Sequence, residues 1–361
     1  MLNVGIVTLH CSYNFGSALQ TYALQTVVEN MGHTATIIDY RSIDYDQYKL
    51  LSKHSSVMRN NLEHADMLAK LFKRRNSFRG FANTNFHLSK ESYSYEAPKK
   101  LNELSDKYDC FVCGSDQIWN LDMTGGPDHA FFLDFAGDKR RIAYAPSLGH
   151  TTFLPENFDR AEVAGLLSQF DFLSVREQES LPLFQPLVTK DIKVVLDPTL
   201  LLDKKFYSGF AENPVPSKDY LFVYLLRESP ELVESACAMA TASNSEILYV
   251  CDHNLPIPNA TNLFGVGPAA FVSLVAHARA VLTNSFHAMI FSIVFNVPFR
   301  VFATDATASR IRGLLTKIGA YELCYSKRCD APIGNIDWQT MEEHLDDLRA
   351  ESLQYLRRAL A

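Results

Sequence analysis

The stretch that decides the fold opens the chain: Val4 to Tyr40 read VGIVTLHCSYNFGSALQTYALQTVVENMGHTATIIDY. Val4 to Leu9 form a continuous apolar run, which is typical of a parallel strand buried on both faces. Apolar residues then recur at helical spacing, and Gly32 stands where a helix C-terminus is expected. Ala35 to Tyr40 supply a second strand. The stretch therefore predicts a βαβ unit with a right-handed crossover and a parallel sheet.

The same alternation of strand and helix continues along the chain. Further strand-like runs of the first lobe are Cys110 to Cys113, Arg141 to Ala145, Phe172 to Val175 and Lys193 to Leu196. Those of a second lobe are Tyr220 to Leu226, Ile247 to Cys251, Ala280 to Thr283 and Phe299 to Phe302. We therefore expect an α/β fold with two Rossmann-like doubly wound lobes facing a central cleft, residues 1–205 and 206–335. Residues 336–361 should form an amphipathic C-terminal helix that could pack back on the first lobe.

Length and composition set limits on function. The chain has 361 residues, 47% of them hydrophobic, which is enough for two domains. A net charge of −7 argues against broad nucleic-acid binding, because phosphate backbones are held by surplus lysine and arginine. The start, MLNVGIVTLH, lacks the pattern of a secretory signal, and no apolar run approaches the roughly 20 residues that span a bilayer. We expect a soluble, cytoplasmic protein.

The seven cysteines suit a reducing compartment better than a disulfide framework. Cys110 and Cys113 form a CxxC inside a predicted strand, where residues three apart point to opposite faces and cannot hold one metal ion. We interpret them as small buried hydrophobic residues, and we predict no metal site.

Lys70 to Lys90, KLFKRRNSFRGFANTNFHLSK, is basic within an acidic protein. One interpretation is a solvated helical face. The other is contact with an anionic lipid surface or acceptor.

Two candidate binding loops follow strands of the first lobe. In NFGSALQ, Asn14 to Gln20, Gly16 allows a sharp turn, and the first N–H groups of the next helix could take an anion. In CGSDQIWN, Ser115, Asp116 and Gln117 stand at the carboxyl end of a strand, where open α/β sheets bind ligands. Asp116 could act as a base toward a sugar hydroxyl or cap a helix. Trp119 could stack on a sugar or lie in the core.

Asp39 ends the second predicted strand, as does the ribose-binding acid of a dinucleotide site, but the accompanying glycine pattern is absent.

Arg176, in SVREQES, could fork onto a carboxylate or phosphate. Its alternative is an ion pair with Glu177, Glu179 or Asp171. The nearby LDPT, which includes Asp197, is interpreted as a structural turn because Pro198 restricts the residue before it.

The fourth candidate is TNSFHAMIFSIVFNVPF, Thr283 to Phe299. Ser285 is a natural N-cap, which places Phe286 and His287 in the first turn of a helix, where an anion is stabilised. His287 could bind a phosphate or donate a proton, or it could be a half-buried histidine bonded to a backbone carbonyl. Arg310 begins another helix one strand later and could reach the same anion, although Arg312 could equally be the exposed partner.

Taken in order, six motifs of this chain resemble those of the polysaccharide pyruvyl transferase family: NFGSALQTYALQ, VCGSDQIWN, AYAPSLG, SVRE, VVLDPTLLL and TNSFHAMIFSIVFNVPF. The resemblance implies a glycosyltransferase-B-like fold with an acceptor side in the first lobe and a donor side in the second. It also implies transfer of pyruvate from phosphoenolpyruvate to a sugar as a cyclic ketal. Such transfer belongs to exopolysaccharide and capsule biosynthesis on a cytoplasmic, lipid-linked precursor.

By this resemblance, Asp116 and His287 are the expected catalytic residues. The expected donor ligands are Arg176, Ser285, Phe286, His287 and Arg310, and the expected acceptor or loop residues are Asn14, Gly16, Ser115, Gln117 and Trp119. Ser285 stands where many members carry arginine, which removes a cation from the donor pocket.

Besides phosphoenolpyruvate as donor substrate, we expect no cofactor. The expected partners are a lipid-linked or oligosaccharide acceptor and, peripherally, the inner face of the cell membrane. Two alternatives remain: a glycosyltransferase that uses a nucleotide sugar, and a non-catalytic glycan- or phosphate-binding homologue.

Overall fold

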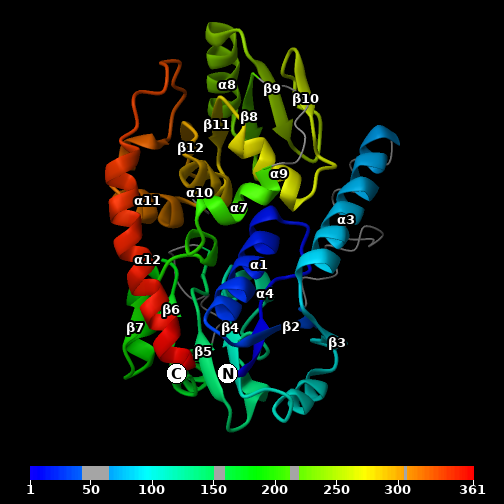
Figure 1. Ribbon diagram of the computed structural model, residues 1–361, viewed down its shortest axis with the longest axis vertical. Coiled ribbons are helices and arrows are strands. Elements are labelled where there is room, and N and C mark those ends of the chain that lie inside the picture. Colours follow the sequence, from blue (N-terminus) through cyan, green and yellow to red (C-terminus); the bar gives the residue numbers. More distant parts are fainter. Residues whose placement is uncertain (43–64, 150–158, 212–218, 305–306) are drawn as a thin grey trace. The chain divides into compact units, whose positions relative to one another are not determined.

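The computed structural model describes residues 1–42, 65–149, 159–211, 219–304 and 307–361 (Figure 1). Its internal contacts divide the chain into two compact units. The first unit comprises Met1–Lys49, Thr84–Leu201 and Asp346–Ala361, and the second comprises Leu50–Asn83 and Leu202–Leu345.

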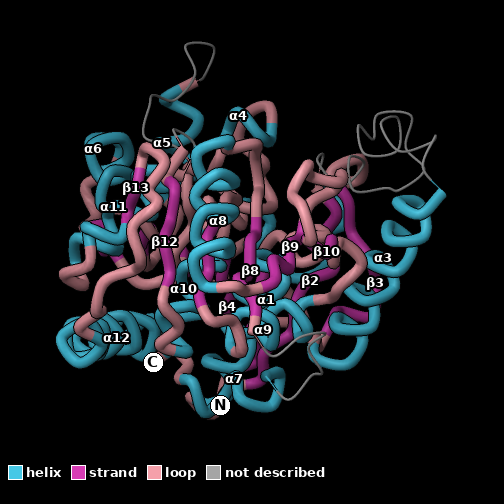
Figure 2. The backbone as a smooth tube through the Cα atoms, turned by 90° about the horizontal axis from the view of Figure 1, so that it is seen from above, coloured by secondary structure: helices cyan, strands magenta, loops and turns pink. Residues whose placement is uncertain are grey.

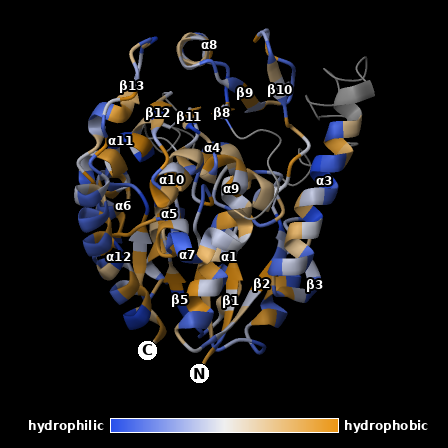
Figure 3. Cartoon of the chain, turned by 45° about the horizontal axis from the view of Figure 1, so that its top comes forward, coloured by the Kyte–Doolittle hydropathy of each residue, from blue (hydrophilic) through white to orange (hydrophobic). Residues whose placement is uncertain are grey.

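The first unit is built on a parallel sheet with the strand order β3-β2-β1-β4-β5. Its strands are β1 (Asn3–Val7), β2 (Thr34–Arg41), β3 (Leu88–Ser94), β4 (Cys110–Cys113) and β5 (Arg140–Ala143). A parallel bridge from Ile142 to Phe172 continues the sheet toward the pair β6 (Leu173–Val175) and β7 (Ile192–Val194). All four residues of β4 are buried, as the apolar composition of a central parallel strand requires. Figure 3 shows the hydrophobic colouring of the strands β1, β2 and β5.

Helix α1 (Phe15–Asn30) connects β1 to β2 and packs against β2 (Figure 1). Asn14 caps its beginning, and Gly32 follows its end in a left-handed conformation with φ of 87°. The predicted βαβ unit is confirmed, including the glycine that ends the helix. Other described helices that lie wholly within this unit are α4 (Leu121–Thr124), α5 (Arg160–Ser168) and α6 (Leu181–Phe184).

The second unit contains a parallel sheet with the order β10-β9-β8-β11-β12-β13. The strands are β8 (Tyr220–Tyr224), β9 (Glu246–Val250), β10 (Ala260–Asn262), β11 (Ala280–Thr283), β12 (Phe299–Phe302) and β13 (Cys324–Tyr325). Helices that lie wholly within this unit are α7 (Lys204–Ala211), α8 (Pro230–Ser243), α9 (Pro268–Ala276), α10 (Phe286–Phe295) and α11 (Ala308–Lys317). Helix α8 lies along β8 and β9 (Figure 2). The alternation of strand and helix predicted for this part of the chain is thus observed.

Helix α3 (Ala65–Asn85) is basic, and its residues up to Asn83 belong to the second unit. It buries Leu71, Arg74, Phe78 and Phe81 on one face. The Arg74 guanidinium lies 4.8 Å from the centre of the Phe264 ring and donates a hydrogen bond of 3.2 Å to the Phe264 carbonyl oxygen. The helix is therefore solvated on one face only, and one of its arginines is part of the core.

Helix α12 (Trp338–Leu360) ends the chain. Its residues from Asp346 onward belong to the first unit. There Tyr355 donates a hydrogen bond of 2.8 Å to the carbonyl oxygen of Ala143 in β5, and Ser352 accepts one of 2.9 Å from the Leu196 amide. Arg349 donates to the Leu200 carbonyl oxygen at 2.9 Å.

No helix in the described part of the chain is long and apolar enough to cross a membrane. The cysteines Cys110 and Cys113 are both buried in β4, and burial raises the pKa of Cys110 to about 11 and that of Cys113 well above its usual value. Burial therefore keeps these thiols protonated, in keeping with their interpretation as small core residues.

Candidate functional site

The loops that carry the six motifs lie at the carboxyl edges of the two sheets. In the first unit, the strand order reverses between β1 and β4, which are neighbours in the sheet. In the second, it reverses between β8 and β11. Open α/β sheets bind ligands at such reversal points, because the connections leave toward opposite faces and open a crevice between them. Each unit therefore has a candidate site at its own reversal point.

In the first unit, a buried polar network joins the loops after β1 and β4. Thr8 donates a hydrogen bond of 3.2 Å to the Ser115 carbonyl oxygen, and the Ser115 amide donates one of 3.1 Å to the side chain of Gln20. The Gln20 amide group donates in turn to the Thr8 hydroxyl at 2.9 Å. The Ser115 hydroxyl donates to the Ala145 carbonyl oxygen at 2.7 Å. Ser115 is fully buried and anchors these loops to each other, so it has no open face for an acceptor.

Asp116 is held within this network by Ser17, whose hydroxyl donates to its carboxylate. The Asp116 carbonyl oxygen accepts a hydrogen bond of 2.8 Å from the Ser147 amide in the AYAPSLG loop. Asp116 has a φ of 67°, which is rare for a residue with a side chain. Helix α4 is capped by Asn120 and not by Asp116, so the capping alternative is wrong. The carboxylate instead lies at the reversal point of the sheet.

Gly114, two residues before Asp116, stands where there is no room for a side chain. Gly114 has a φ of 114°, and a Cβ added to it would overlap the carbonyl oxygen of Tyr144. The loop of the GSD motif thus approaches the loop after β5 closely enough to exclude any side chain. This contact fixes the direction in which Asp116 leaves the strand.

Arg176 forms internal ion pairs. Its Nη1 lies 2.6 Å from Oδ2 of Asp197 and its Nε lies 3.1 Å from Oε1 of Glu177, and its side chain is 2% exposed. Burial lowers the pKa of Arg176, but the carboxylates of Glu177, Asp197 and Asp116 outweigh burial and raise it. The ion-pair alternative is therefore the observed one for Glu177. Because the guanidinium is buried among internal carboxylates, the expectation that Arg176 binds the donor directly is not supported.

Asp197 has a larger role than its sequence motif predicted. Its Oδ2 pairs with Arg176, and its Oδ1 accepts hydrogen bonds from the Thr199 amide at 3.0 Å and from the Thr199 hydroxyl at 2.7 Å. It is both the cap of the turn and the counter-ion of Arg176. The Arg176 amide also donates a hydrogen bond of 3.1 Å to the Pro146 carbonyl oxygen, so the NFGS, GSD, APSLG, SVRE and LDPT motifs meet at the carboxyl ends of neighbouring strands.

Two expectations for the first unit require correction. The Asn14 side chain accepts hydrogen bonds from the amides of Gly16 at 2.8 Å and of Ser17 at 3.3 Å, so this helix terminus does not offer those amides to an anion. Trp119 is fully buried, stacks on Phe132 with 5.2 Å between ring centres, and donates to the Phe131 carbonyl oxygen at 3.2 Å. It is therefore a core residue and not a sugar platform.

Gln117 remains partly exposed. Its side-chain oxygen accepts a hydrogen bond of 2.9 Å from the Asn120 amide group. Gly149, the last residue of the AYAPSLG motif, has a φ of 83°, and a Cβ there would overlap the Gln117 side chain.

A histidine that the sequence did not single out lies beside Asp39. His10 Nε2 is 3.2 Å from Oδ1 of Asp39, and Ser92 donates to the same carboxylate. Burial alone would raise the pKa of Asp39, but hydrogen bonds from His10 and Ser92, with the charges of His10 and Arg41, lower it to about 2. His10 follows β1 and Asp39 lies in β2, so the pair becomes visible only once these two strands are known to be neighbours.

In the second unit, the TNSFH motif connects β11 to β8. Thr283 donates a hydrogen bond of 2.6 Å to the Tyr224 carbonyl oxygen. Asn284 accepts one of 2.8 Å from the Leu226 amide and donates one of 2.8 Å to the Arg227 carbonyl oxygen. The first residues of the motif thus hold the loop after β8 against the end of β11. Helical periodicity could not have revealed this role.

Ser285 caps α10 as predicted. Its hydroxyl oxygen accepts a hydrogen bond of 3.4 Å from the Ala288 amide, and helix α10 begins at Phe286. His287 therefore lies in the first turn, and it is 7% exposed, with its ring edge-on to Phe286 at 5.4 Å. Arg310 lies in the first turn of α11, which follows β12, the strand next to β11. Both helices therefore begin at the same edge of the sheet.

A cluster of possible metal ligands follows β9. The donor atoms of Cys251, Asp252 and His253 lie within 4.8 Å of one another, and Asp252 Oδ1 is 2.8 Å from His253 Nδ1. Burial raises the pKa of Cys251 to about 11, so a metal would have to displace the thiol proton. Sequence analysis did not single out this group.

Solved structures that resemble this chain share its architecture at low identity. The putative UDP-N-acetylglucosamine 2-epimerase of Listeria monocytogenes is 12% identical, with a TM-score of 0.52 over 99% of this chain and 90% of that chain. The UDP-N-acetylglucosamine 2-epimerase of Rickettsia bellii is 11% identical, with a TM-score of 0.51 over 99% and 96%. These likenesses concern the fold alone, and they confirm the predicted α/β fold of the glycosyltransferase-B type.

No curated protein matches the sequence. A sequence model described as polysaccharide pyruvyl transferase matches residues 14–306. The match begins at Asn14, the N-cap of α1, and contains all six motifs named above. The family indicates a transferase that acts on polysaccharides. With most of its length matched, the chain belongs to the polysaccharide pyruvyl transferase family.

Proposed function

We propose that the protein transfers pyruvate from phosphoenolpyruvate to a sugar of a polysaccharide precursor and forms a pyruvyl ketal. Family membership supports pyruvyl transfer in general. One observation supports phosphoenolpyruvate as the donor. At the reversal point of the second sheet, Ser285 caps α10 and His287 lies in the first turn of that helix. An N-terminal helix turn stabilises a phosphate, and an imidazole beside it can donate a proton.

The chemistry requires one proton donor and one proton acceptor. An acid protonates the methylene carbon of phosphoenolpyruvate, which becomes a methyl group and leaves a cationic C2. A sugar hydroxyl then attacks C2 and gives its proton to a base. A second hydroxyl forms the other C–O bond as the C–O bond to phosphate breaks, and its proton passes to the departing phosphate, so the products are a cyclic ketal and inorganic phosphate. His287 is our candidate acid.

Asp116 is our candidate base, acting from the first unit on an acceptor hydroxyl. Its carboxylate is held by the Ser17 hydroxyl at the reversal point of that sheet. General acid and base groups each contribute roughly two to four powers of ten to a rate. Arg176, Asp197 and Glu177 support the loops around Asp116 through ion pairs and do not bind the donor in this proposal.

The donor carries a phosphate and a carboxylate, so its site needs positive groups within a net-acidic protein. Arg310 and the beginnings of α10 and α11 supply them in the second unit. Ser285 contributes a helix cap and no charge. We infer that Arg310 is the main cation for the donor.

A lipid-linked acceptor places the protein at the inner face of the membrane in this proposal. The solvated face of α3 supports it, because Lys73 and Arg79 are exposed there and Phe72 is 42% exposed. Basic residues with an exposed aromatic ring favour contact with anionic lipid.

The test is release of phosphate from phosphoenolpyruvate by the purified protein, with galactose-, mannose- and glucose-terminated lipid-linked acceptors. We expect release with one acceptor class and a decrease of at least roughly 100-fold in kcat for His287→Ala. His277→Ala is the matched control, because His277 is an exposed histidine at the end of α9 in the same unit. It should leave kcat unchanged.

The proposal is overturned if the protein releases no phosphate with any of the acceptors while its circular dichroism spectrum shows that it is folded. If phosphate is released but His287→Ala retains the rate, His287 is not the acid. Turnover of a nucleotide sugar in place of phosphoenolpyruvate would assign the glycosyltransferase alternative.

A further inference from the structure

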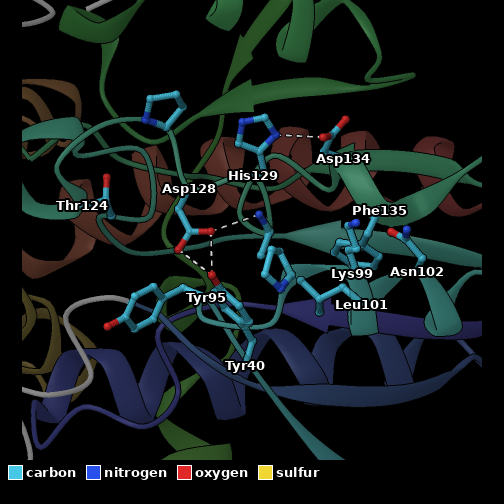
Figure 4. Close-up of a pocket in the computed structure, with 13 residues that line it drawn as sticks. Tyr40, Tyr95, Lys99, Leu101, Asn102, Thr124, Asp128, His129, Asp134 and Phe135 are labelled. Carbon is cyan, nitrogen blue, oxygen red and sulfur yellow. Dashed lines mark hydrogen bonds and ion pairs between the residues drawn. The ribbon is translucent and has the colours of Figure 1, made fainter. Parts of the chain in front are cut away.

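A pocket of about 440 Å³ opens in the first unit, apart from the network around Asp116 (Figure 4). It lies beside the end of β2, the segment before and within the short 3₁₀ helix η2 (Pro98–Leu104), and the segment from Thr124 to Phe135. Its volume falls within the range of about 300–1,000 Å³ that is usual for small-molecule sites. None of the motifs shared with the family contributes a residue to its lining.

Aromatic rings form the apolar part of the lining. Tyr40 packs edge-on against Phe131 with 5.5 Å between ring centres, and Phe135 packs edge-on against Phe111 at 5.0 Å. These contacts hold Tyr40 and Phe135 in place before any ligand arrives. Tyr95 also lines the pocket, and it is 37% exposed, so its ring is accessible to a ligand. A rigid ring next to an exposed one offers a flat surface for the C–H face of a pyranose.

One carboxylate, that of Asp128, is the central polar group. Both its oxygens accept the Tyr40 hydroxyl at 2.8 Å, and Oδ1 also accepts the Ala130 amide at 3.0 Å. A carboxylate has about four acceptor positions, so Asp128 can accept further hydroxyl groups while Tyr40 orients it. Burial raises the pKa of Asp128, although the hydrogen bonds from Tyr40 and Ala130 lower it in part. This half-buried acceptor thus lies next to open space.

The other polar groups of the lining fix its charge. Asn102 and Lys99 supply donors, and His129 is paired with Asp134 at 2.8 Å and with Glu162 at 3.1 Å. Two carboxylates therefore face one lysine and one histidine that is already engaged with carboxylates. This balance disfavours a phosphate or a nucleoside diphosphate and favours a neutral ligand with many hydroxyl groups.

We propose that this pocket binds a neutral hexopyranose ring, with Asp128 accepting hydroxyl groups and Tyr95 covering the apolar face of the sugar. Binding of the sugar is independent of pyruvyl transfer. That the sugar belongs to the acceptor rests on the proposed function. The pocket then holds a ring of the acceptor chain and contributes affinity without taking part in chemistry.

Saturation-transfer difference NMR and titration with the full-length protein test the binding. The probes are the methyl glycosides of galactose, mannose, glucose and N-acetylglucosamine. At least one should bind the wild-type protein, and Asp128→Asn should weaken it about tenfold or more, because a hydrogen bond to a charged acceptor is lost. Tyr95→Ala should weaken it roughly tenfold through lost stacking. Thr241→Ala, which changes a pocket of the second unit, should bind as the wild type does.

Tyr95 is an exposed side chain, so its variant keeps the test valid even where Asp128→Asn fails to fold. Binding of none of the four glycosides overturns the proposal, and so does binding that Tyr95→Ala leaves unchanged.

Turnover separates this inference from the proposed function. If glycosides bind and the variants weaken them, but no phosphate is released from phosphoenolpyruvate, the pocket stands and the proposed function fails. With an active enzyme, Tyr95→Ala should raise the acceptor KM with kcat unchanged, the signature of lost ground-state binding. An unchanged acceptor KM would overturn the assignment of this pocket to the acceptor.

Discussion

Individual polar residues at the sheet edges could be placed from the sequence, but their partners could not. Asp116 and His287 follow apolar runs that end in polar loops, and a parallel sheet brings such positions to one edge. Asp197, the partner of Arg176, was interpreted as a turn residue, and His10, the partner of Asp39, was not singled out. Pairing depends on which loops become neighbours, and that is decided by strand order.

The Asp39 carboxylate should make stability depend on pH. Its pKa is about 2 in the folded protein, below the ordinary value, so its stabilising contribution is complete above about pH 5. As pH falls through the ordinary value toward 2, the folded state must take up a proton that the unfolded state binds more readily, and the contribution is lost. We expect Asp39→Asn to lower the free energy of unfolding by about 1–2 kcal/mol at pH 7, with allowance for partial exposure.

Urea unfolding followed by circular dichroism at pH 7, 5, 4 and 3 measures this. The difference between wild type and Asp39→Asn should shrink steadily below pH 5. Asp106→Asn, which changes an exposed carboxylate of the same unit, is the control. A difference that is constant from pH 7 to pH 3 would show that the pKa of Asp39 is not lowered in the folded protein.

At the scale of elements, capped helices and central strands could be predicted to within a few residues, and edge strands could not. Helix α8 begins after Ser229, whose hydroxyl accepts from the Leu232 amide, with Pro230 in its first position. Strand β3 reads LSKESYS and has one fully buried residue, Tyr93, so it carries little apolar signal. Strands β10 and β13 have three and two residues. A short edge strand is specified by its neighbour, not by its own composition.

Helix α3 shows that composition alone does not tell which basic residues of a helix are exposed. Its arginines look alike in sequence, yet Arg74 is buried against Phe264 while Arg79 is exposed. Burial lowers the pKa of Arg74, although contact with Tyr224 and Asp252 opposes the shift. The exposed face alone is available to a partner.

That face should bind anionic lipid. We expect the wild-type protein to sediment with vesicles of phosphatidylglycerol and phosphatidylcholine, and the double variant Lys73→Glu, Arg79→Glu to partition at least about 30-fold less, because each basic residue near such a surface contributes about 1 kcal/mol. The control, Lys100→Glu with Lys327→Glu, makes the same change of charge at exposed lysines elsewhere. Equal losses in both double variants, or no binding by the wild type, would rule out a docking role for α3.

At the scale of the whole molecule, the alternation of strand and helix predicted two α/β units. The position of a segment along the chain, however, was a poor guide to the unit in which it packs. Residues of α3 up to Asn83 pack with the second unit although they precede β3 of the first. The last sixteen residues, Asp346–Ala361, return to the first unit. The amphipathic pattern of the C-terminal helix suggested its return, but the crossing of α3 leaves no mark in local periodicity, because it is decided by which surface remains uncovered.

The return of α12 should be essential for the stability of the first unit. Its Leu356 is fully buried, Tyr355 bonds to β5, and Ser352 and Arg349 satisfy backbone groups at Leu196 and Leu200. Leu356→Ala should therefore lower the free energy of unfolding by about 2–5 kcal/mol, and removal of residues 346–361 should prevent stable folding. Arg357→Ala, one residue away on the exposed face, should change it by less than about 0.5 kcal/mol. Urea unfolding compares the two variants, and equal, small effects would mean that α12 is dispensable for the first unit.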